Sequence, residues 1–207
     1  DKDGKVIQDL DCLLKNWIGS DRPVSILDLS GVPSDILQTT IGALLRLLYE
    51  ALFWSRDLSQ GGRHRPLLVV MEEAHNFIKR YNESSEEISA SQLCTESFEK
   101  IAREGRKFGI NLVISSQRPS EISKTVVSQC NSFIIHKITN KQDFEIITRL
   151  LSNNSYQYTN VLSCLETQHA LIFGEAFNMI DITKVCDAKP TPKSKNPEII
   201  NLWKRST

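Results

Sequence analysis

The amino-acid sequence predicts an α/β fold with a mostly parallel sheet and helices on both of its faces. Two observations support this class. Predicted strands and helices alternate along the chain, and the strands are continuous apolar runs, such as PLLVVM at residues 66–71. Strands of this kind are buried on both faces, which is typical of parallel sheets in α/β proteins. With 207 residues, 40% of them hydrophobic, the chain is long enough for one domain with a sizeable core.

The first part of the chain reads as strand, helix, strand and helix. Residues 23–30 (PVSILDLS) are a compact apolar run that ends in a turn, and they predict a buried strand. Apolar residues at helical spacing predict a helix over residues 36–54, with a cap at Ser34-Asp35. The second strand covers residues 66–71, and a helix is expected over residues 74–80.

The rest of the chain continues the same alternation. A polar, acidic surface loop is expected at residues 81–92. The next helical pattern, residues 93–108, ends at Gly109, a residue typical of helix C-termini. The remaining predicted elements are strands at 110–115 and 132–138, helices at 122–130 and 140–151, a late strand pair at 170–173 and 179–185, and a Lys/Pro-rich tail at 189–207.

Charge, cysteine content and hydropathy exclude several classes of protein. The 25 Lys and Arg residues balance 25 Asp and Glu residues, which disfavours a protein that coats nucleic acid by net charge. The five cysteines are odd in number and widely spaced, which argues against a disulfide framework or a zinc site. The apolar stretches around residues 110–115 and 170–173 are too short to span a bilayer, and no signal peptide is seen. We therefore expect a cytoplasmic protein without a membrane partner.

Two carboxylates follow the strand at residues 66–71. Glu72 and Glu73 emerge at its C-terminal end, which is the edge where open α/β sheets bind ligands. In nucleoside triphosphatases one acid at this position holds Mg²⁺ and the next activates the attacking water. The alternative is an acidic helix start, because Glu in a first helical turn complements the helix dipole without any catalytic role.

The strand at residues 110–115 also ends in polar side chains. If the two strands are neighbours, Ser116 and Gln117 lie beside the two glutamates. An uncharged amide there can hydrogen-bond a γ-phosphate or the attacking water. The alternative is that Ser-Gln-Arg-Pro-Ser forms an ordinary turn.

Two arginines precede that strand. Arg103 and Arg106 are three residues apart, so they share a face if the segment is helical. A guanidinium group suits the spread charge of a phosphoryl group in transfer. A solvated basic helix end, favoured by the helix dipole, is the alternative reading.

In this order, the segments resemble the HerA–FtsK superfamily of hexameric DNA-pumping ATPases, and most closely its HerA branch. The segment VVMEEAHNF of this chain resembles the family's Walker B strand. The segment AREGRKFGINLVISSQRPSEIS resembles its arginine and sensor segment. Three further segments resemble the family's elements before and after these two: PVSILDLSGVP, TVVSQCNSFIIHKITNKQD and ALIFGEAFNM. The resemblance therefore covers the chain from about Pro23 to its end.

The resemblance implies a RecA-like ATPase that binds ATP and Mg²⁺ between the subunits of a homo-oligomeric ring, a hexamer in this family. It places Glu72 at the magnesium position, Glu73 at the general base and Gln117 at the polar sensor, with Ser116 beside the nucleotide. Arg103 or Arg106 would reach the ATP of the neighbouring subunit, and the sequence does not decide between them. Glu72 stands where Asp is commoner, which keeps a carboxylate on a longer side chain.

The sequence departs from the family pattern in one larger respect. No G-x-x-x-x-G-K-[ST] phosphate-binding loop occurs among its nine glycines. We therefore expect residues 1–188 to be the C-terminal part of a RecA-like ATPase domain, followed by a tail at 189–207. On this expectation the chain alone is inactive, whereas its parent protein hydrolyses ATP.

The expected function is that of an ATP-driven double-stranded DNA translocase or helicase, coupled to a nuclease or an antiviral effector. Basic residues of the loop after the first long helix are candidates for gripping DNA, and the alternative is an ordinary solvated loop: Arg56, Arg63 and Arg65. One alternative is a non-catalytic module for oligomerisation or effector docking. Another is a DEAH-like RNA helicase, suggested by Glu72-Glu73-Ala74-His75, although Gln117-Arg118-Pro119 fits the DNA-pumping ATPases better.

Overall fold

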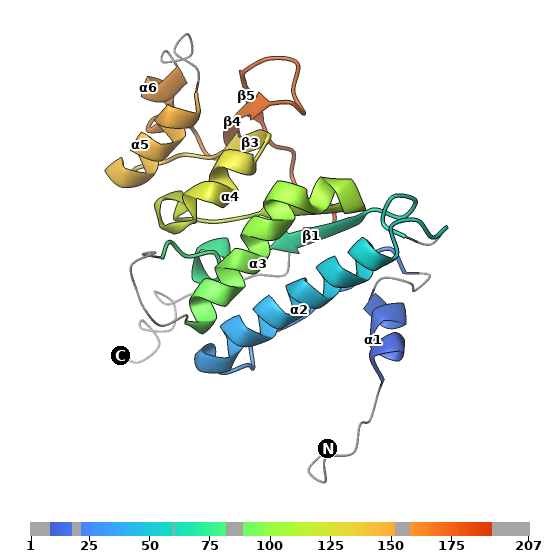
Figure 1. Cartoon of the computed structure of the whole chain (residues 1–207). Helices are drawn as coiled ribbons and strands as arrows, with labels where there is room; N and C mark the ends of the chain where they lie inside the picture. Colours follow the sequence, from blue (N-terminus) through green and yellow to red (C-terminus); the bar gives the residue numbers. More distant parts are fainter. Residues whose placement is uncertain (1–8, 18–21, 60, 82–88, 152–157, 192–207) are drawn as a thin grey trace, which may run out of the picture. The chain divides into compact units, whose positions relative to one another are not determined.

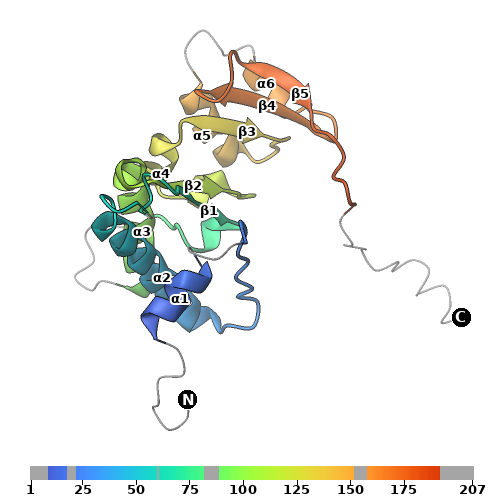
Figure 2. The same cartoon turned by 90° about the vertical axis from the view of Figure 1, so that its right-hand side faces the viewer.

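A computed structural model shows how these segments fold (Figures 1 and 2). The structure describes residues 9–17, 22–59, 61–81, 89–151 and 158–191. The chain divides into two compact units, Asp1–Asn131 and Ser132–Thr207. The tail expected at residues 189–207 falls mostly outside the described residues, and so does most of the loop expected at 81–92.

The first unit combines helices with a parallel strand pair. Strand β1 (Leu67–Met71) pairs with β2 (Ile110–Ile114) in parallel, with Leu67 opposite Ile110 and Met71 opposite Ile114. Two parallel strands require a crossover connection, and α3 (Ala90–Glu104) lies within it. The other elements are helices α1 (Leu10–Trp17), α2 (Ser34–Trp54) and α4 (Lys124–Gln129), and the 3₁₀ turns η1 (Ala74–Asn76), η2 (Gly105–Phe108) and η3 (Pro119–Glu121).

Helices α2 and α3 lie side by side and provide most of the core of this unit (Figures 1 and 2). The apolar residues of the two helices face each other, and those that are buried are Ile41, Leu45, Leu48, Tyr49, Leu52, Cys94, Phe98 and Ile101. The helices approach closely at Gly42, where an added Cβ would stand 3.1 Å from the Cα of Cys94. Tyr49 also donates a hydrogen bond of 2.8 Å to Glu104 and lies under the ammonium group of Lys100.

Helix α2 adds a feature to the two apolar stretches considered above. Its segment Ile36–Trp54 is long and apolar enough to cross a membrane, by length and composition only. Its buried residues recur at helical spacing on the side that packs on α3, whereas Arg46 is exposed. Burial on one side in this manner is the pattern of a core helix in a globular unit.

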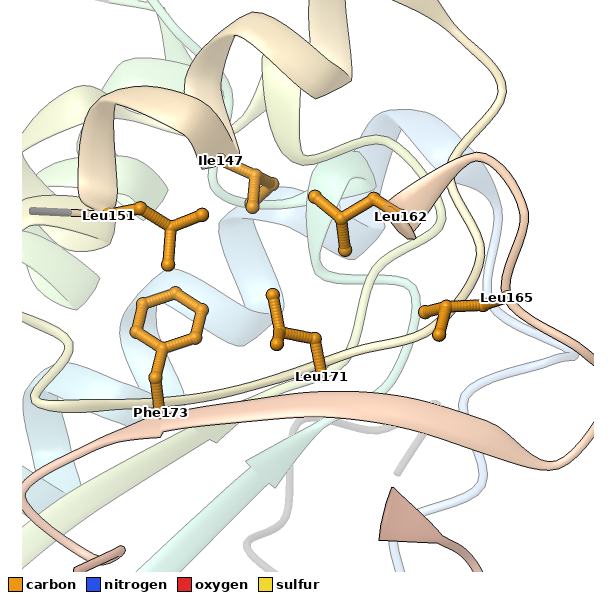
Figure 3. Close-up of a cluster of buried hydrophobic side chains, with 6 residues drawn as sticks. All are labelled: Ile147, Leu151, Leu162, Leu165, Leu171 and Phe173. Carbon is orange, nitrogen blue, oxygen red and sulfur yellow. The ribbon is translucent and has the colours of Figure 1, made fainter. Parts of the chain in front are cut away.

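The second unit is a three-stranded antiparallel sheet packed against helices. Strands β3 (Ser132–Ile135), β4 (His169–Gly174) and β5 (Asp181–Lys184) lie in the order β3-β4-β5. Helices α5 (Lys141–Leu150) and α6 (Thr159–Leu162) lie on one side of β4. Figure 3 shows the apolar side chains that meet between them: Ile147, Leu151, Leu162, Leu165, Leu171 and Phe173.

The α/β class and most of the predicted strands and helices are confirmed, and the sheet is more divided than expected. Among the described residues, parallel pairing is confined to β1 and β2, while β3, β4 and β5 are antiparallel. One face of the parallel pair is open, since Leu68 and Val70 are each 57% exposed and Val113 is 45% exposed. Helices therefore cover only one face of these two strands in the part of the chain that the structure describes.

Two local predictions are wrong. Residues 23–29 are not a strand: they have irregular backbone, and Val24 and Ile26 are exposed. The helix expected over residues 74–80 is only the short turn η1, followed by an isolated bridge between Lys79 and Ile122. A third difference is one of bounds, because the helix expected from residue 93 begins at Ala90 and tightens into η2 at Gly105.

Candidate active site at the carboxyl ends of β1 and β2

The parallel pairing of β1 and β2 brings the predicted polar residues together. Met71 and Ile114 end the register, and the backbone ladder continues one step beyond them. Ser115 N–H donates to the carbonyl of Met71, and Ala74 N–H donates to the carbonyl of Ser115, both at 2.9 Å. The residues that follow the two strands are therefore fixed side by side at one edge of the sheet.

Glu73 turns the chain sharply at this edge. Its backbone has φ 49° and ψ 44°, in the left-handed region that few residues other than glycine, asparagine and aspartate adopt. Such a conformation costs on the order of 1–3 kcal/mol and persists only where the surroundings impose it. Here the next residue, Ala74, is fully buried and hydrogen-bonded to β2, so the turn is held from both strands.

The side chain of Glu73 meets Gln117 across the strand ends. The Nε2 amide of Gln117 donates a hydrogen bond of 2.7 Å to Oε1 of Glu73. The carboxylate is 46% exposed, so its remaining surface is open to solvent or to a bound substrate. This bond orients the Gln117 amide so that its oxygen is left as an acceptor near the carboxylate.

His75 and Ser116 extend this contact into a network. Nδ1 of His75 lies 3.2 Å from Oγ of Ser116 and 3.4 Å from Oε2 of Glu73. Ser116 Oγ also accepts a hydrogen bond of 3.0 Å from the backbone N–H of Arg118. The sequence alone assigns no role to His75, since the motif Glu-Glu-Ala-His does not show that the imidazole points to the other strand.

Glu72 is exposed at the same edge. Among the described residues, no group of three or more His, Cys, Asp or Glu side chains could form a metal cage. A single exposed carboxylate suits Mg²⁺, which keeps several waters and takes its other ligands from substrate phosphates. Glu72 therefore fits the expected magnesium position, without the geometry of an all-protein metal site.

The structure separates the two candidate arginines. Arg103 lies in the last turn of α3, where its Nη2 is 3.7 Å from Oε2 of Glu99. The Glu99 side chain is only 7% exposed and accepts a hydrogen bond of 2.5 Å from Ser123. Because a buried carboxylate needs a charge partner, Arg103 has a structural task within this chain.

Arg106 is exposed on η2, and its side chain makes no hydrogen bond or ion pair to the described residues. It precedes β2, whereas Glu73 follows β1. Each of these parallel strands has five residues, so their two ends are about 13 Å apart. Arg106 and Glu73 of one chain thus lie at opposite ends of the strand pair.

The candidate DNA-binding arginines occupy the loop that leads into β1. Arg56 and Arg63 each pair with Asp57 at 3.4 Å, and Arg56 also lies over the ring of Phe53. Arg65 is exposed. Local partners therefore neutralise part of the positive charge that the sequence suggested here.

The α/β arrangement of this chain recurs in a solved protein. A solved structure of the genome packaging NTPase B204 from Sulfolobus turreted icosahedral virus 2, in complex with ATP-gammaS, shares this fold with a TM-score of 0.50. The two sequences are 16% identical, and the match covers 70% of this chain and 62% of that one. No family model matches the sequence.

The chain is a homologue of the HerA helicases, as the sequence motifs predicted. It is 30% identical over 183 residues to the DNA double-strand break repair helicase HerA of Sulfurisphaera tokodaii, a match that covers 88% of this chain. It is 28% identical over 183 residues to HerA of Sulfolobus acidocaldarius, and 33% identical over 139 residues to a probable HerA of Methanocaldococcus jannaschii. The matched regions span 35%, 35% and 26% of those relatives, so the chain corresponds to about a quarter to a third of their length.

Proposed function

We propose that the protein carrying this chain is an ATP hydrolase that drives movement along double-stranded DNA. The observation that carries this proposal is the hydrogen bond of 2.7 Å between Gln117 and Glu73 at the carboxyl edge of the parallel strands. The similarity to HerA helicases supports it, and the fold shared with a packaging NTPase agrees with it. A purely structural module does not require a glutamate with a strained backbone whose carboxylate accepts a hydrogen bond from the Gln117 amide.

Hydrolysis requires that water attack the γ-phosphorus while the bond from that phosphorus to the β–γ bridging oxygen breaks and ADP leaves. We assign the proton of the attacking water to the carboxylate of Glu73. The Gln117 amide holds one oxygen of that carboxylate and offers its own oxygen to the same water. Glu72 would hold Mg²⁺, which supplies charge neutralisation at the phosphates.

We further propose that the motor is a ring of identical subunits with ATP between neighbours. Arg106 is the better candidate for the residue that acts on the neighbour's ATP, because it is exposed and lies at the strand end away from Glu73. Arg103 is engaged with the buried Glu99. A hexamer, as in the family that the motifs resemble, is the ring size we propose.

The loop before β1 is the proposed place of DNA contact. Arg65 is the strongest DNA-binding candidate of the loop before β1, since Arg56 and Arg63 share Asp57. We propose that the ring works in the cytoplasm with a nuclease or an antiviral effector. The HerA relatives are named as DNA double-strand break repair helicases, which supports work on DNA ends.

ATP hydrolysis by the complete protein tests this function. We expect release of phosphate to rise when double-stranded DNA is added, and to respond weakly to RNA of equal length. A protein that neither hydrolyses ATP nor responds to DNA would contradict the proposal and favour the assembly module. Stimulation by RNA alone would favour the DEAH-like helicase.

A further inference from the structure

His75 stands between the two strand ends that form the candidate site. It belongs to η1, directly after β1, and its side chain is only 13% exposed. Its Nδ1 atom is within 3.4 Å of both Ser116 Oγ, which follows β2, and Glu73 Oε2. The ring therefore contacts the second oxygen of the same carboxylate whose first oxygen is bound by Gln117.

The neighbours of Nδ1 indicate which ring nitrogen of His75 carries the proton. Ser116 Oγ already accepts from the backbone N–H of Arg118 and can accept one further hydrogen bond. A lone pair on Nδ1 would face the negative carboxylate of Glu73, which is unfavourable, whereas an Nδ1–H group is attracted to it. The geometry thus favours a proton on Nδ1, hydrogen-bonded to Ser116 Oγ at 3.2 Å and 3.4 Å from the carboxylate oxygen of Glu73.

An orienting contact matters here because a general base must point at one water. The Glu73 side chain is 46% exposed, and an exposed glutamate otherwise samples several rotamers. Gln117 restrains one oxygen, and a second contact is needed to fix the plane of the carboxylate. A misplacement of about 1 Å at a reacting group can lower a rate by about 10²-fold.

We propose that His75 is a positioning residue, which fixes the carboxylate plane of Glu73 through Nδ1–H and links it to Ser116 on the neighbouring strand. The inference rests on the proposed function, since it concerns the general base of the same site. His75 does not touch the substrate in this role. Its effect reaches the reaction only through Glu73.

Two substitutions of equal size separate hydrogen bonding from packing. His75→Asn keeps an N–H donor on Cγ, close to the position of Nδ1. Leucine has the same number and branching of non-hydrogen side-chain atoms as asparagine, so His75→Leu removes the donor at equal size. In the complete protein, His75→Leu is expected to lower kcat for ATP hydrolysis by about 10- to 100-fold. KM for ATP and the affinity for a non-hydrolysable analogue stay the same, and His75→Asn retains most of kcat.

A double variant tests whether His75 acts through Glu73. If it does, adding His75→Leu to Glu73→Gln lowers the residual rate no further, because residues that act as a unit are not additive. Tyr49→Phe, which removes a hydrogen bond between α2 and α3, serves as the control with unchanged kcat. Thermal unfolding of each variant accounts for any loss of folded protein.

The inference is overturned if His75→Asn and His75→Leu lose kcat equally, if neither loses it, or if KM changes in step with kcat. It is also overturned if the double variant is slower than Glu73→Gln. Failure of the proposed function is seen separately, since it appears as a wild type without hydrolysis or a Glu73→Gln variant at the wild-type rate. Either of those results removes the basis for a positioning role as well.

Discussion

Glu73 combines a strained backbone with a side chain held at two points. The left-handed turn directs the carboxylate toward the end of β2, where Gln117 binds it at 2.7 Å. A residue with an ordinary backbone would continue along the strand direction instead. The placement of this one carboxylate therefore depends on the buried Ala74 and on the ladder between Ala74 and Ser115, as much as on the side chain.

Cysteine reactivity gives a residue-level test of the packing. Cys94 is fully buried between α2 and α3, and burial raises the pKa of its thiol to about 11, so about one thiol in a thousand is ionised at pH 8. Cys12, Cys164 and Cys186 are exposed. Brief alkylation of the folded protein at pH 8 is expected to modify these three and spare Cys94, as measured by peptide mass spectrometry. Labelling of Cys94 as fast as the exposed cysteines would show that the α2–α3 packing is wrong.

At this scale the sequence predicts residues that follow strands and misses contacts between strands. The meeting of Glu73 and Gln117 could be predicted because each lies a few residues beyond an apolar run, and the two runs were expected to be neighbouring parallel strands. His75 could not, since its role depends on the left-handed turn at Glu73. Nor could the sequence distinguish Arg103 from Arg106, because the difference lies in the burial of Glu99 four residues before Arg103.

The loop before β1 is packed against η2 through glycine backbone. Gly109 has φ 76°, and a Cβ on it would lie 1.9 Å from the carbonyl oxygen of Gly62. A Cβ on Gly62 would lie 2.1 Å from the carbonyl oxygen of Phe108. Gly62 and Gly109 are thus needed for close packing, and Leu67 N–H then donates to the carbonyl of Gly109 at 2.7 Å to begin the parallel pairing.

Replacement of these glycines tests the element-level contact. Gly109→Ala is expected to lower the free energy of unfolding by at least about 2 kcal/mol, because it adds both a left-handed alanine and a steric clash. Gly31→Ala is the matched control, since nothing lies within 4 Å of its added Cβ, and it should change stability by less than about 0.5 kcal/mol. Chemical denaturation followed by circular dichroism measures both. Equal effects would mean that the loop does not pack on η2 as described.

Element prediction succeeds where an apolar run has a partner in the chain and fails where it has none. Residues 67–71 and 110–114 pair with each other, so their strands form as predicted. Residues 23–29 have similar composition but pair with no strand in the described part of the chain, and an unpaired segment gains no ladder hydrogen bonds. The helix expected after Glu73 fails for a local reason, because a left-handed residue at its start interrupts the helical backbone.

At the scale of the whole molecule, the proposed catalytic groups are divided between the two ends of the β1–β2 pair. Glu73 and Gln117 lie at the carboxyl end, and Arg106 precedes β2 at the other end. In a ring with head-to-tail interfaces, one end of each subunit faces the opposite end of the next subunit. This arrangement is why we propose that Arg106 completes the site of the adjacent subunit.

Mixed rings test that proposal. Rings of Arg106→Ala alone or of Glu73→Gln alone are expected to be inactive. In an equal mixture about a quarter of the interfaces combine an intact Glu73 with an intact Arg106, so hydrolysis should partly return. Arg103→Ala should instead lower the melting temperature, since it leaves Glu99 without its charge partner. A mixture no more active than the separate variants would mean that Arg106 does not act between subunits.

The central claim is that Glu73 takes the proton of the attacking water. Single-turnover ATP hydrolysis by the complete protein tests it most directly, with Glu73→Gln compared with Glu50→Gln, a glutamate on α2 paired with Lys100. Glu73→Gln is expected to slow hydrolysis by about 10²- to 10⁴-fold while nucleotide binding is kept. Glu50→Gln should remain at the wild-type rate. Hydrolysis by Glu73→Gln at the rate of Glu50→Gln would contradict the assignment of the active site.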